Sequence, residues 1–387
     1  GSTILIAQFY GAKDYENTRK TIDTVMITNY ILSIAVTILG LIITRPLLNW
    51  LKTPPDVIPD AEAYLRVIFI GMIGLIGYNM ISAILRGLGD SKTPLYFLII
   101  ATVLNIILDI VFILVFHWGV AGAAWATVIS QVISFIIGVI YLNKKHTIIK
   151  ISLRNAKFDK KILFESIRIG FPTGVQQTLV SISFVALQGI INSFGTVVIA
   201  AYTAASRVQI FGVMPAMNMS MAVSSFTGQN LGAGKQDRVK KGFFAGLKIS
   251  LAIALATMIV ILLFGRYFIM LFNDNPEVIQ IGYECLMIVS PFFILGSIMF
   301  ITMGVLRGAG DTFTTMIISV FALWAIRLPV AKVLSDRIGY SGLFWSAGAE
   351  WLVAAAIVLV YYSTGRWKNK VSVGKFRHSD SEKSEQE

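Results

Sequence analysis

The amino-acid sequence predicts an all-α polytopic membrane protein made of two related six-helix bundles, the first of which is incomplete. Three observations lead to this prediction. The composition is strongly apolar, long apolar segments recur along nearly the whole chain, and short motifs of the first half return in the second half at a constant spacing.

The composition does not suit a protein surrounded by water. Of the 387 residues, 56% are hydrophobic and only 14% are charged, whereas soluble domains carry about 25% charged residues. The mean hydropathy is +0.73. A soluble helical protein would show polar stripes repeating every turn, but these segments are apolar nearly all round. The single cysteine, Cys285, excludes an internal disulfide.

Apolar segments of the length needed to cross a bilayer, about 20 residues, follow one another through the chain. The first is the end of a helix that runs to about Tyr10 and stops at Gly11. Ten full spans are then expected, near residues 22–44, 62–85, 93–116, 119–142, 170–194, 197–230, 243–271, 281–306, 314–334 and 340–363. Prolines 172, 215, 291 and 329 fall inside spans and predict kinks.

Polar segments divide the chain into four parts. We expect an N-terminal helical bundle at residues 1–143, a Lys-rich linker at 144–161, a C-terminal bundle at 162–365 and a polar tail at 366–387. The C-terminal bundle is expected to open with a short amphipathic stretch around residues 162–169.

The net charge of +12 could suggest a nucleic-acid partner, but the positions of the basic residues indicate a membrane instead. Most lysines and arginines fall in alternate connections, together with the 144–161 linker and the tail. The opposite set contains only Arg45, Lys52, Arg266, Lys332 and Arg337. Since cytoplasmic loops carry the excess of positive charge, the linker and the C-terminus are predicted to be cytoplasmic.

An internal repeat has a spacing of about 221 residues. Leu85-Arg-Gly-Leu-Gly-Asp90 returns as Leu306-Arg-Gly-Ala-Gly-Asp311, and the Gln-x-x-Gly-Ala motif that ends at Ala12 returns ending at Ala233. By the same spacing, the first half lacks about one and a half helices of its repeat unit, and twelve spans are expected in the intact protein. Six spans per half predict parallel repeats, with a site at their interface near the bilayer midplane.

The order and spacing of these motifs resemble the multidrug and toxic compound extrusion (MATE) family over nearly the whole chain to about residue 365. The phrases that carry the resemblance are Ile6-Ala-Gln-Phe-Tyr-Gly-Ala-Lys13, Leu85-Arg-Gly-Leu-Gly-Asp-Ser-Lys-Thr-Pro94, Asn105-Ile-Ile-Leu-Asp109, Trp118-Gly-Val-Ala-Gly-Ala-Ala-Trp-Ala-Thr127 and Ala201-Tyr-Thr-Ala-Ala-Ser-Arg207 running to Gly228-Gln-Asn-Leu-Gly-Ala-Gly234. The resemblance implies two bundles in a V-shaped arrangement that alternate in access.

The implied function is secondary active efflux of drugs and other amphipathic, often cationic compounds in exchange for Na⁺ or H⁺. A protein of this kind is not an enzyme, needs no cofactor besides its coupling ion, and is expected as a monomer in the cell membrane. The alternative is a lipid-linked precursor flippase of the same wider superfamily. Such flippases tend to carry several basic residues around a central cavity, for which only Arg207 and Arg327 qualify here.

The clearest ionisable group within a span is Asp109, and Asn105 lies four residues earlier on the same helix face. A carboxylate beside a neutral oxygen suits Na⁺, and a buried carboxyl of raised pKa suits H⁺. The resemblance adds Thr127 as a third ligand and implies a further Asp outside this sequence. Asp109 could instead only hydrogen-bond a neighbouring helix. No comparable carboxylate occurs in the matching second-half span, so a second cation site is not expected, and no metal site other than one for Na⁺ is predicted.

Further polar residues within spans are weaker candidates. Gln176, Gln177, Asn192 and Arg207 could line a substrate cavity, although the amides are equally compatible with helix packing. Arg207 and Arg327 could each pair with a carboxylate, and Glu350 is a plausible partner for Arg327.

Overall fold

The computed structural model describes residues 1–145, 156–373 and 376, and it is helical in nearly all of them. The chain divides into two compact units, Ser2–Ser166 and Ile167–Glu387, which are described separately. The division falls inside one long helix. Most of the predicted 144–161 linker and most of the predicted 366–387 tail lie outside the described residues.

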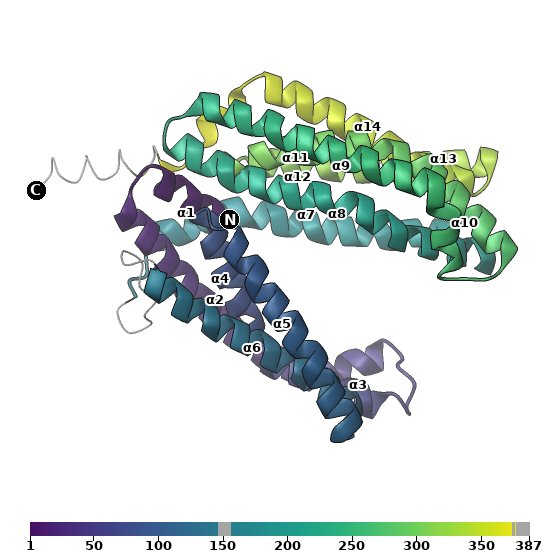
Figure 1. Cartoon of the computed structure of the whole chain (residues 1–387), viewed down its shortest axis with the longest axis horizontal. Coiled ribbons are helices and arrows are strands. Elements are labelled where there is room, and N and C mark those ends of the chain that lie inside the picture. The colour runs from purple at the N-terminus through teal and green to yellow at the C-terminus, as the bar shows by residue number, and fades with distance from the viewer. Residues whose placement is uncertain (146–155, 374–375, 377–387) are drawn as a thin grey trace, which may run out of the picture. The chain divides into compact units, whose positions relative to one another are not determined.

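The N-terminal unit contains six α-helices and one π-helical turn among its described residues (Figure 1). They are α1 (Ser2–Gly11), α2 (Tyr15–Trp50), α3 (Ile58–Ile70), α4 (Met72–Gly87), α5 (Lys92–Ile110), the π-turn η1 (Val111–Val115) and α6 (Gly119–Lys145). Its core gathers apolar side chains of α1, α2, α4, α5 and α6, with Ile81, Ile84 and Leu85 of α4 fully buried at its centre.

The C-terminal unit is a bundle of long helices, two of which are interrupted by short turns (Figure 1). Its elements are α7 (Lys160–Asn192), α8 (Thr196–Gly232), α9 (Gln236–Met270), α10 (Pro276–Val289), the 3₁₀ turn η3 (Ser290–Phe292), α11 (Phe293–Gly308), α12 (Thr312–Phe321), the π-turn η4 (Ala322–Arg327), α13 (Leu328–Ile338), α14 (Ser341–Ser363) and the 3₁₀ turn η5 (Arg366–Lys370). The first seven residues of α7 belong to the other unit.

The helices have the length and composition of membrane spans, which confirms the all-α membrane fold predicted from the sequence. Nine helices among the described residues could cross a bilayer, and α3 with α4 makes a tenth candidate that is bent by 49°. Many large apolar side chains point outward, including Ile42 (65% exposed) and Leu263 (66% exposed). In water such a surface would be unfavourable, but in lipid it needs no cover.

Three predicted span boundaries need correction. The segment predicted at residues 62–85 is broken at Gly71, where a Cβ atom would lie only 2.2 Å from Cγ2 of Val128 on α6. The segment predicted at 22–44 is part of a much longer helix, α2. The amphipathic stretch at 162–169 is not separate, because it forms the first turns of α7.

The internal repeat is visible as repeated atomic contacts. A Cβ atom at Gly87 would lie 3.1 Å from the carbonyl oxygen of Thr3, and one at Gly308 would lie 2.3 Å from that of Ser224. Gly308 follows Gly87 by 221 positions, and Ser224 follows Thr3 by the same 221 positions. The following glycines of the same motif, Gly89 and Gly310, have φ angles of 89° and 93° and let the chain leave the helix.

The aspartate of the same motif ties two helices together in the N-terminal unit. The Asp90 carboxylate accepts hydrogen bonds from the Thr93 hydroxyl at 2.7 Å and from the Tyr141 hydroxyl at 3.2 Å. Lys145 lies 3.3 Å from the same oxygen. Asp90 therefore links the start of α5 to the end of α6.

The C-terminal unit repeats this arrangement with Asp311. Its carboxylate accepts hydrogen bonds from the Thr314 hydroxyl at 2.8 Å and from the Tyr361 hydroxyl at 2.5 Å. The threonine follows at a spacing of 221 residues and the tyrosine at 220. The two halves therefore share a fold down to individual hydrogen bonds.

The helix contact at Gly308 can be tested by substitution. Gly308→Ala should lower stability by about 1–3 kcal/mol, because the new methyl group would meet the Ser224 carbonyl oxygen, which belongs to the backbone of α8 and cannot move away alone. Thermal unfolding of the purified protein in detergent measures the change. Gly174→Ala on α7 is the matched control, since a Cβ there meets nothing within 4 Å. Equal stability of the two variants would contradict the close contact.

The stability contributed by the hydrogen bonds to the Asp90 carboxylate should depend on pH. Burial opposes ionisation of Asp90, but hydrogen bonds from Thr93 and Lys145 outweigh it and lower the pKa of the carboxyl to about 2. The folded-state pKa is thus below the value of about 3.9 in an unfolded chain. The resulting stability is complete above pH 4 and is lost as the pH falls towards 2.

We therefore expect Asp90→Asn to lower the melting temperature by about 2–4 °C at pH 7 and by less at pH 3. Melting curves at the two pH values test this, with Asp274→Asn, at an exposed position between α9 and α10, as the control. A difference between wild type and Asp90→Asn that stays constant from pH 7 to pH 3 would show that the charge of Asp90 is not what stabilises the tie.

Candidate functional site

The predicted cation ligands lie where α5 packs against α6 in the N-terminal unit. The two helices run antiparallel: Ser134 of α6 donates a hydrogen bond to the Phe97 carbonyl oxygen at 3.3 Å, and the Asn105 amide nitrogen lies 3.4 Å from the Thr127 hydroxyl oxygen. The Thr127 hydroxyl itself donates to the Ala123 carbonyl oxygen. Asn105 and Thr127 are therefore brought together across the helix pair.

Asp109 follows Asn105 by one turn on the same face of α5. Its Oδ1 atom is buried and has no hydrogen-bond partner among the residues that the structure describes. A buried carboxylate oxygen without a donor is costly, by several kcal/mol for an ionised group. A helix–helix hydrogen bond, the alternative role for Asp109, is not seen for this oxygen.

These residues fit a small hard cation. Asp109 supplies a carboxylate, Asn105 can offer its amide oxygen and Thr127 its hydroxyl oxygen, and such oxygens are the ligands that alkali and alkaline-earth ions prefer. A second feature is the π-turn η1, which begins two residues after Asp109 and closes with a 3.0 Å hydrogen bond from Phe116 N–H to the Val111 carbonyl.

Sequence reasoning missed Gln131, which lies one turn after Thr127 on the same face of α6. Its Oε1 atom is also buried and without a partner in the part of the chain that the structure describes. Because α5 and α6 are antiparallel, Gln131 extends the polar face on the side away from Asp109. The spacing of four residues between Thr127 and Gln131 was the available signal.

In the C-terminal unit, Arg327 and Glu350 form an ion pair. The Arg327 Nη1 atom lies 2.8 Å from Glu350 Oε2, and the two side chains are only 12% and 10% exposed. The guanidinium also lies 5.6 Å from the ring centre of Phe184 on α7. The pair therefore joins η4 to α14 inside the bundle.

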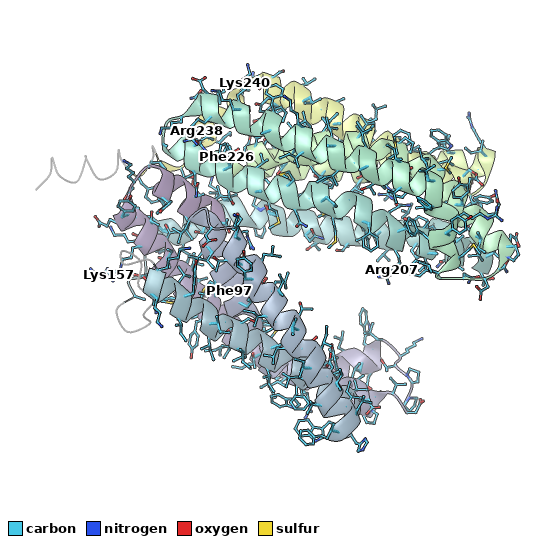
Figure 2. The ribbon with its side chains drawn as sticks, in the orientation of Figure 1. Phe97, Lys157, Arg207, Phe226, Arg238 and Lys240 are labelled. Carbon is cyan, nitrogen blue, oxygen red and sulfur yellow. The ribbon has the colours of Figure 1, made fainter. Side chains whose placement is uncertain are left out.

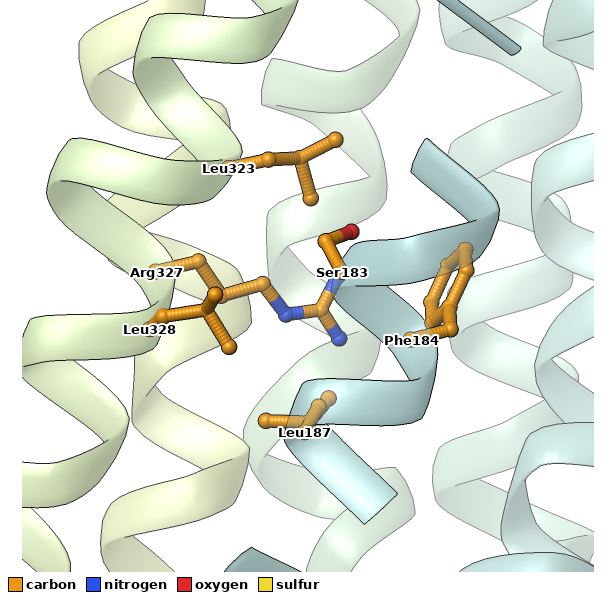
Figure 3. A pocket seen from close by; sticks show the side chains of 6 residues that line it. All are labelled: Ser183, Phe184, Leu187, Leu323, Arg327 and Leu328. Atoms are coloured by element: carbon orange, nitrogen blue, oxygen red, sulfur yellow. The ribbon is translucent and has the colours of Figure 1, made fainter. Parts of the chain in front are cut away.

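Figure 3 shows the small pocket beside this pair, with the Arg327 side chain reaching between α7 and η4. It is lined by Ser183, Phe184, Leu187, Leu323, Arg327 and Leu328. The Nε atom of Arg327 is buried without a hydrogen-bond partner among the described residues. The pocket is too tight for a drug-sized molecule, since its empty space is about 150 Å³.

The proposed substrate residues do not form one cluster. Gln176 is buried, and its Nε2 atom donates to the Ser319 hydroxyl at 2.6 Å, which ties α7 to α12. Gln177 is exposed on α7. Asn192, the last residue of α7, accepts a hydrogen bond from Gln188. It lies about 22 Å from Gln177 along the helix axis.

Arg207 is exposed on α8, and Figure 2 shows it at the edge of its unit. The structure gives it no ion pair or hydrogen bond within residues 1–145, 156–373 and 376. It thus differs from Arg327, whose charge is neutralised by Glu350.

Comparison with known proteins places this architecture in a family. The MatE family model matches residues 1–111 and 172–333, one segment in each half. The chain is a member of the MatE family. This is a family of transporters, so the MatE protein described here is a multi-pass membrane transporter and not an enzyme.

Two curated relatives come from Bacillus subtilis strain 168. The MatE chain is 34% identical over 365 residues to the probable multidrug resistance protein YpnP, covering 94% of this chain and 81% of the relative. It is also 34% identical over 379 residues to the probable multidrug resistance protein YoeA, covering 96% and 82%.

Among solved structures, one described as the outward-facing conformation of a multidrug resistance MATE family transporter of the MOP superfamily superposes with a TM-score of 0.89. The identity is 25%, and the match covers 96% of this chain and 83% of that one. The resemblance inferred from short motifs is thereby confirmed.

Proposed function

We propose that this MatE protein is a secondary active multidrug exporter that expels amphipathic, often cationic compounds in exchange for Na⁺ or H⁺ by alternating access. The observation that carries the proposal is the buried Asp109 carboxylate oxygen without a partner, beside the contact between Asn105 and Thr127. A carboxylate in this position has a different net charge when it is free and when it has bound Na⁺ or H⁺.

Coupling follows from the cost of burying charge. The ionised, empty form of Asp109 is unfavourable inside a membrane span, and binding of Na⁺ or H⁺ relieves that cost. The packing of α5 against α6 and the π-turn next to Asp109 can respond to the difference. Asn105 and Thr127 hold the cation beside the carboxylate, so they set how tightly it binds.

The relatives support the choice of substrate. Both Bacillus relatives carry names of probable multidrug resistance proteins, and a further relative from Staphylococcus saprophyticus, 25% identical, is named multidrug export protein MepA. A broad range of amphipathic compounds is therefore the substrate class we propose.

The flippase alternative receives less support from the arrangement of charge. It predicted several basic residues around a cavity, and only Arg207 and Arg327 qualified. The Arg327 charge is compensated by Glu350 at 2.8 Å, which leaves one unpaired arginine among these two.

Transport in reconstituted vesicles tests the proposal. In liposomes with an imposed Na⁺ or H⁺ gradient, full-length protein should accumulate a fluorescent organic cation in the compartment that has the higher concentration of the coupling cation. Only one of the two gradients should drive transport. Valinomycin-clamped membrane potentials separate coupling from the electrical force on the dye. Dye movement that is independent of both cations would refute cation-coupled export.

Topology offers a second test. We expect the C-terminus to be cytoplasmic, so Lys370→Cys should react with a membrane-impermeant maleimide only when the reagent reaches the cytoplasmic side, and Lys52→Cys only from outside. The wild-type background is suitable because its one cysteine, Cys285, is fully buried and therefore inert. Labelling of the Lys370→Cys protein in intact cells would reverse the proposed orientation.

A further inference from the structure

Arg207 is a charged residue well inside a membrane-spanning helix. It lies eleven residues, about 16 Å, from the start of α8 at Thr196. Its side chain is exposed at the edge of the C-terminal unit (Figure 2). Arginine does not lose its proton in proteins, so this position carries a permanent positive charge.

The helix face around Arg207 is apolar and flexible. Phe211 is 73% exposed, and Met214 and Met221, which follow on the same face, are 56% and 50% exposed. Methionine side chains adapt to different apolar shapes, because they are unbranched and polarisable. This part of α8 thus joins one cation to an adaptable apolar surface.

The carboxylates inside the same unit are already engaged. Glu350 is paired with Arg327, and Glu284 accepts hydrogen bonds from Tyr340 at 3.2 Å and Ser341 at 2.5 Å beside the turn between α13 and α14. The charge of Arg207 is therefore not balanced within its unit, as far as the structure describes it. An arginine inside a span faces a water-filled cavity or a polar partner, because lipid tails cannot solvate it.

From these observations we infer that Arg207 recognises a carboxylate on the transported compound, while the exposed Phe and Met side chains of α8 receive its apolar body. The guanidinium forms two parallel hydrogen bonds with a carboxylate, and the single charges of the two groups cancel. The inference rests on the proposed export function and extends the substrates from organic cations to amphiphiles that carry a carboxylate.

A pair of dyes isolates this group. Rhodamine 110 has a free carboxylate, and rhodamine 123 is its methyl ester, so the two differ only there. In liposomes of phosphatidylcholine, wild-type protein should transport both dyes, and Arg207→Gln should raise the KM for rhodamine 110 at least about tenfold while leaving that for rhodamine 123 unchanged. Arg207→Lys should give an intermediate KM for rhodamine 110, because lysine keeps the positive charge but cannot form the two parallel hydrogen bonds of a guanidinium.

Arg266→Gln is the matched control, since Arg266 is also exposed but lies near the end of α9. It should leave both dyes unaffected. An unchanged ratio of the two KM values in Arg207→Gln, or an equal loss for both dyes, overturns the role of Arg207 and leaves the export function intact. Wild-type protein that moves neither dye would instead refute the export function.

A phospholipid headgroup offers the same singly charged anion chemistry as a carboxylate. The assay is therefore repeated in vesicles that contain phosphatidylglycerol. If the Arg207→Gln effect follows the lipid and not the carboxyl group of the dye, Arg207 binds lipid and the inference is wrong.

Discussion

Asp109→Asn is expected to abolish cation-driven export while preserving the fold. The substitution keeps the shape of the side chain and removes its charge, so the site can neither take up a proton nor offer a negative charge to Na⁺. An ionised aspartate inside the membrane costs on the order of 2.5–3.5 kcal/mol even on the lenient insertion scale, and this cost is what cation binding relieves. Uptake of a fluorescent organic cation into vesicles under Na⁺ and H⁺ gradients measures the loss.

The neighbours of Asp109 should give graded effects. Asn105→Ala and Thr127→Ala each remove one oxygen and should shift the cation concentration needed for half-maximal transport upward, without stopping transport. Thr102→Ala is the control on the same helix, since the Thr102 hydroxyl only bonds the Leu98 carbonyl of its own helix. If Asp109→Asn protein exports normally and still responds to the gradient, coupling lies elsewhere.

The ion pair of the C-terminal unit should produce the largest effect on stability. Glu350→Ala leaves the buried Arg327 guanidinium without its counter-charge and should lower the free energy of unfolding by about 3–5 kcal/mol. Removing both charges together, in Arg327→Met with Glu350→Leu, should restore much of this loss because apolar side chains of similar size fill the same space. Thermal unfolding in detergent compares the three proteins.

A double variant that is no more stable than Glu350→Ala would show that the pair is worth more than the cost of burying its charges. The transport assay adds information here. If the stable double variant still exports dye, the pair is structural, whereas a stable but inactive double variant would indicate that the charges take part in transport.

The sequence predicted the spans and the repeat well, because both depend on short stretches of neighbouring residues. Each span needs an apolar run to satisfy its backbone in lipid. The Arg-Gly-x-Gly-Asp motif needs its glycine at a positive φ, as found for Gly89 and Gly310. The pairing of Arg327 with Glu350 was also foreseeable, since two opposite charges inside an apolar bundle have few other partners.

Features set by tertiary contacts were not foreseeable. Hydropathy gives no sign of the bend at Gly71, where Val128 of α6 lies so close that a Cβ atom would meet it. Proline does indicate one break, since Pro291 lies in the 3₁₀ turn between α10 and α11. The sequence placed Arg207 and Arg327 in the same class, and only the distances separate a neutralised arginine from an exposed one.

The two π-turns have a consequence for how this chain tolerates insertions and deletions. In η4, Leu328 N–H bonds the Leu323 carbonyl five residues back, one residue more than in an α-helix. A turn of this kind absorbs a single residue while the helix on either side keeps its orientation. Deleting one residue from Ala322–Arg327 would therefore shorten the turn to an ordinary α-helical one, whereas the same deletion in α12 would rotate everything that follows by about 100°.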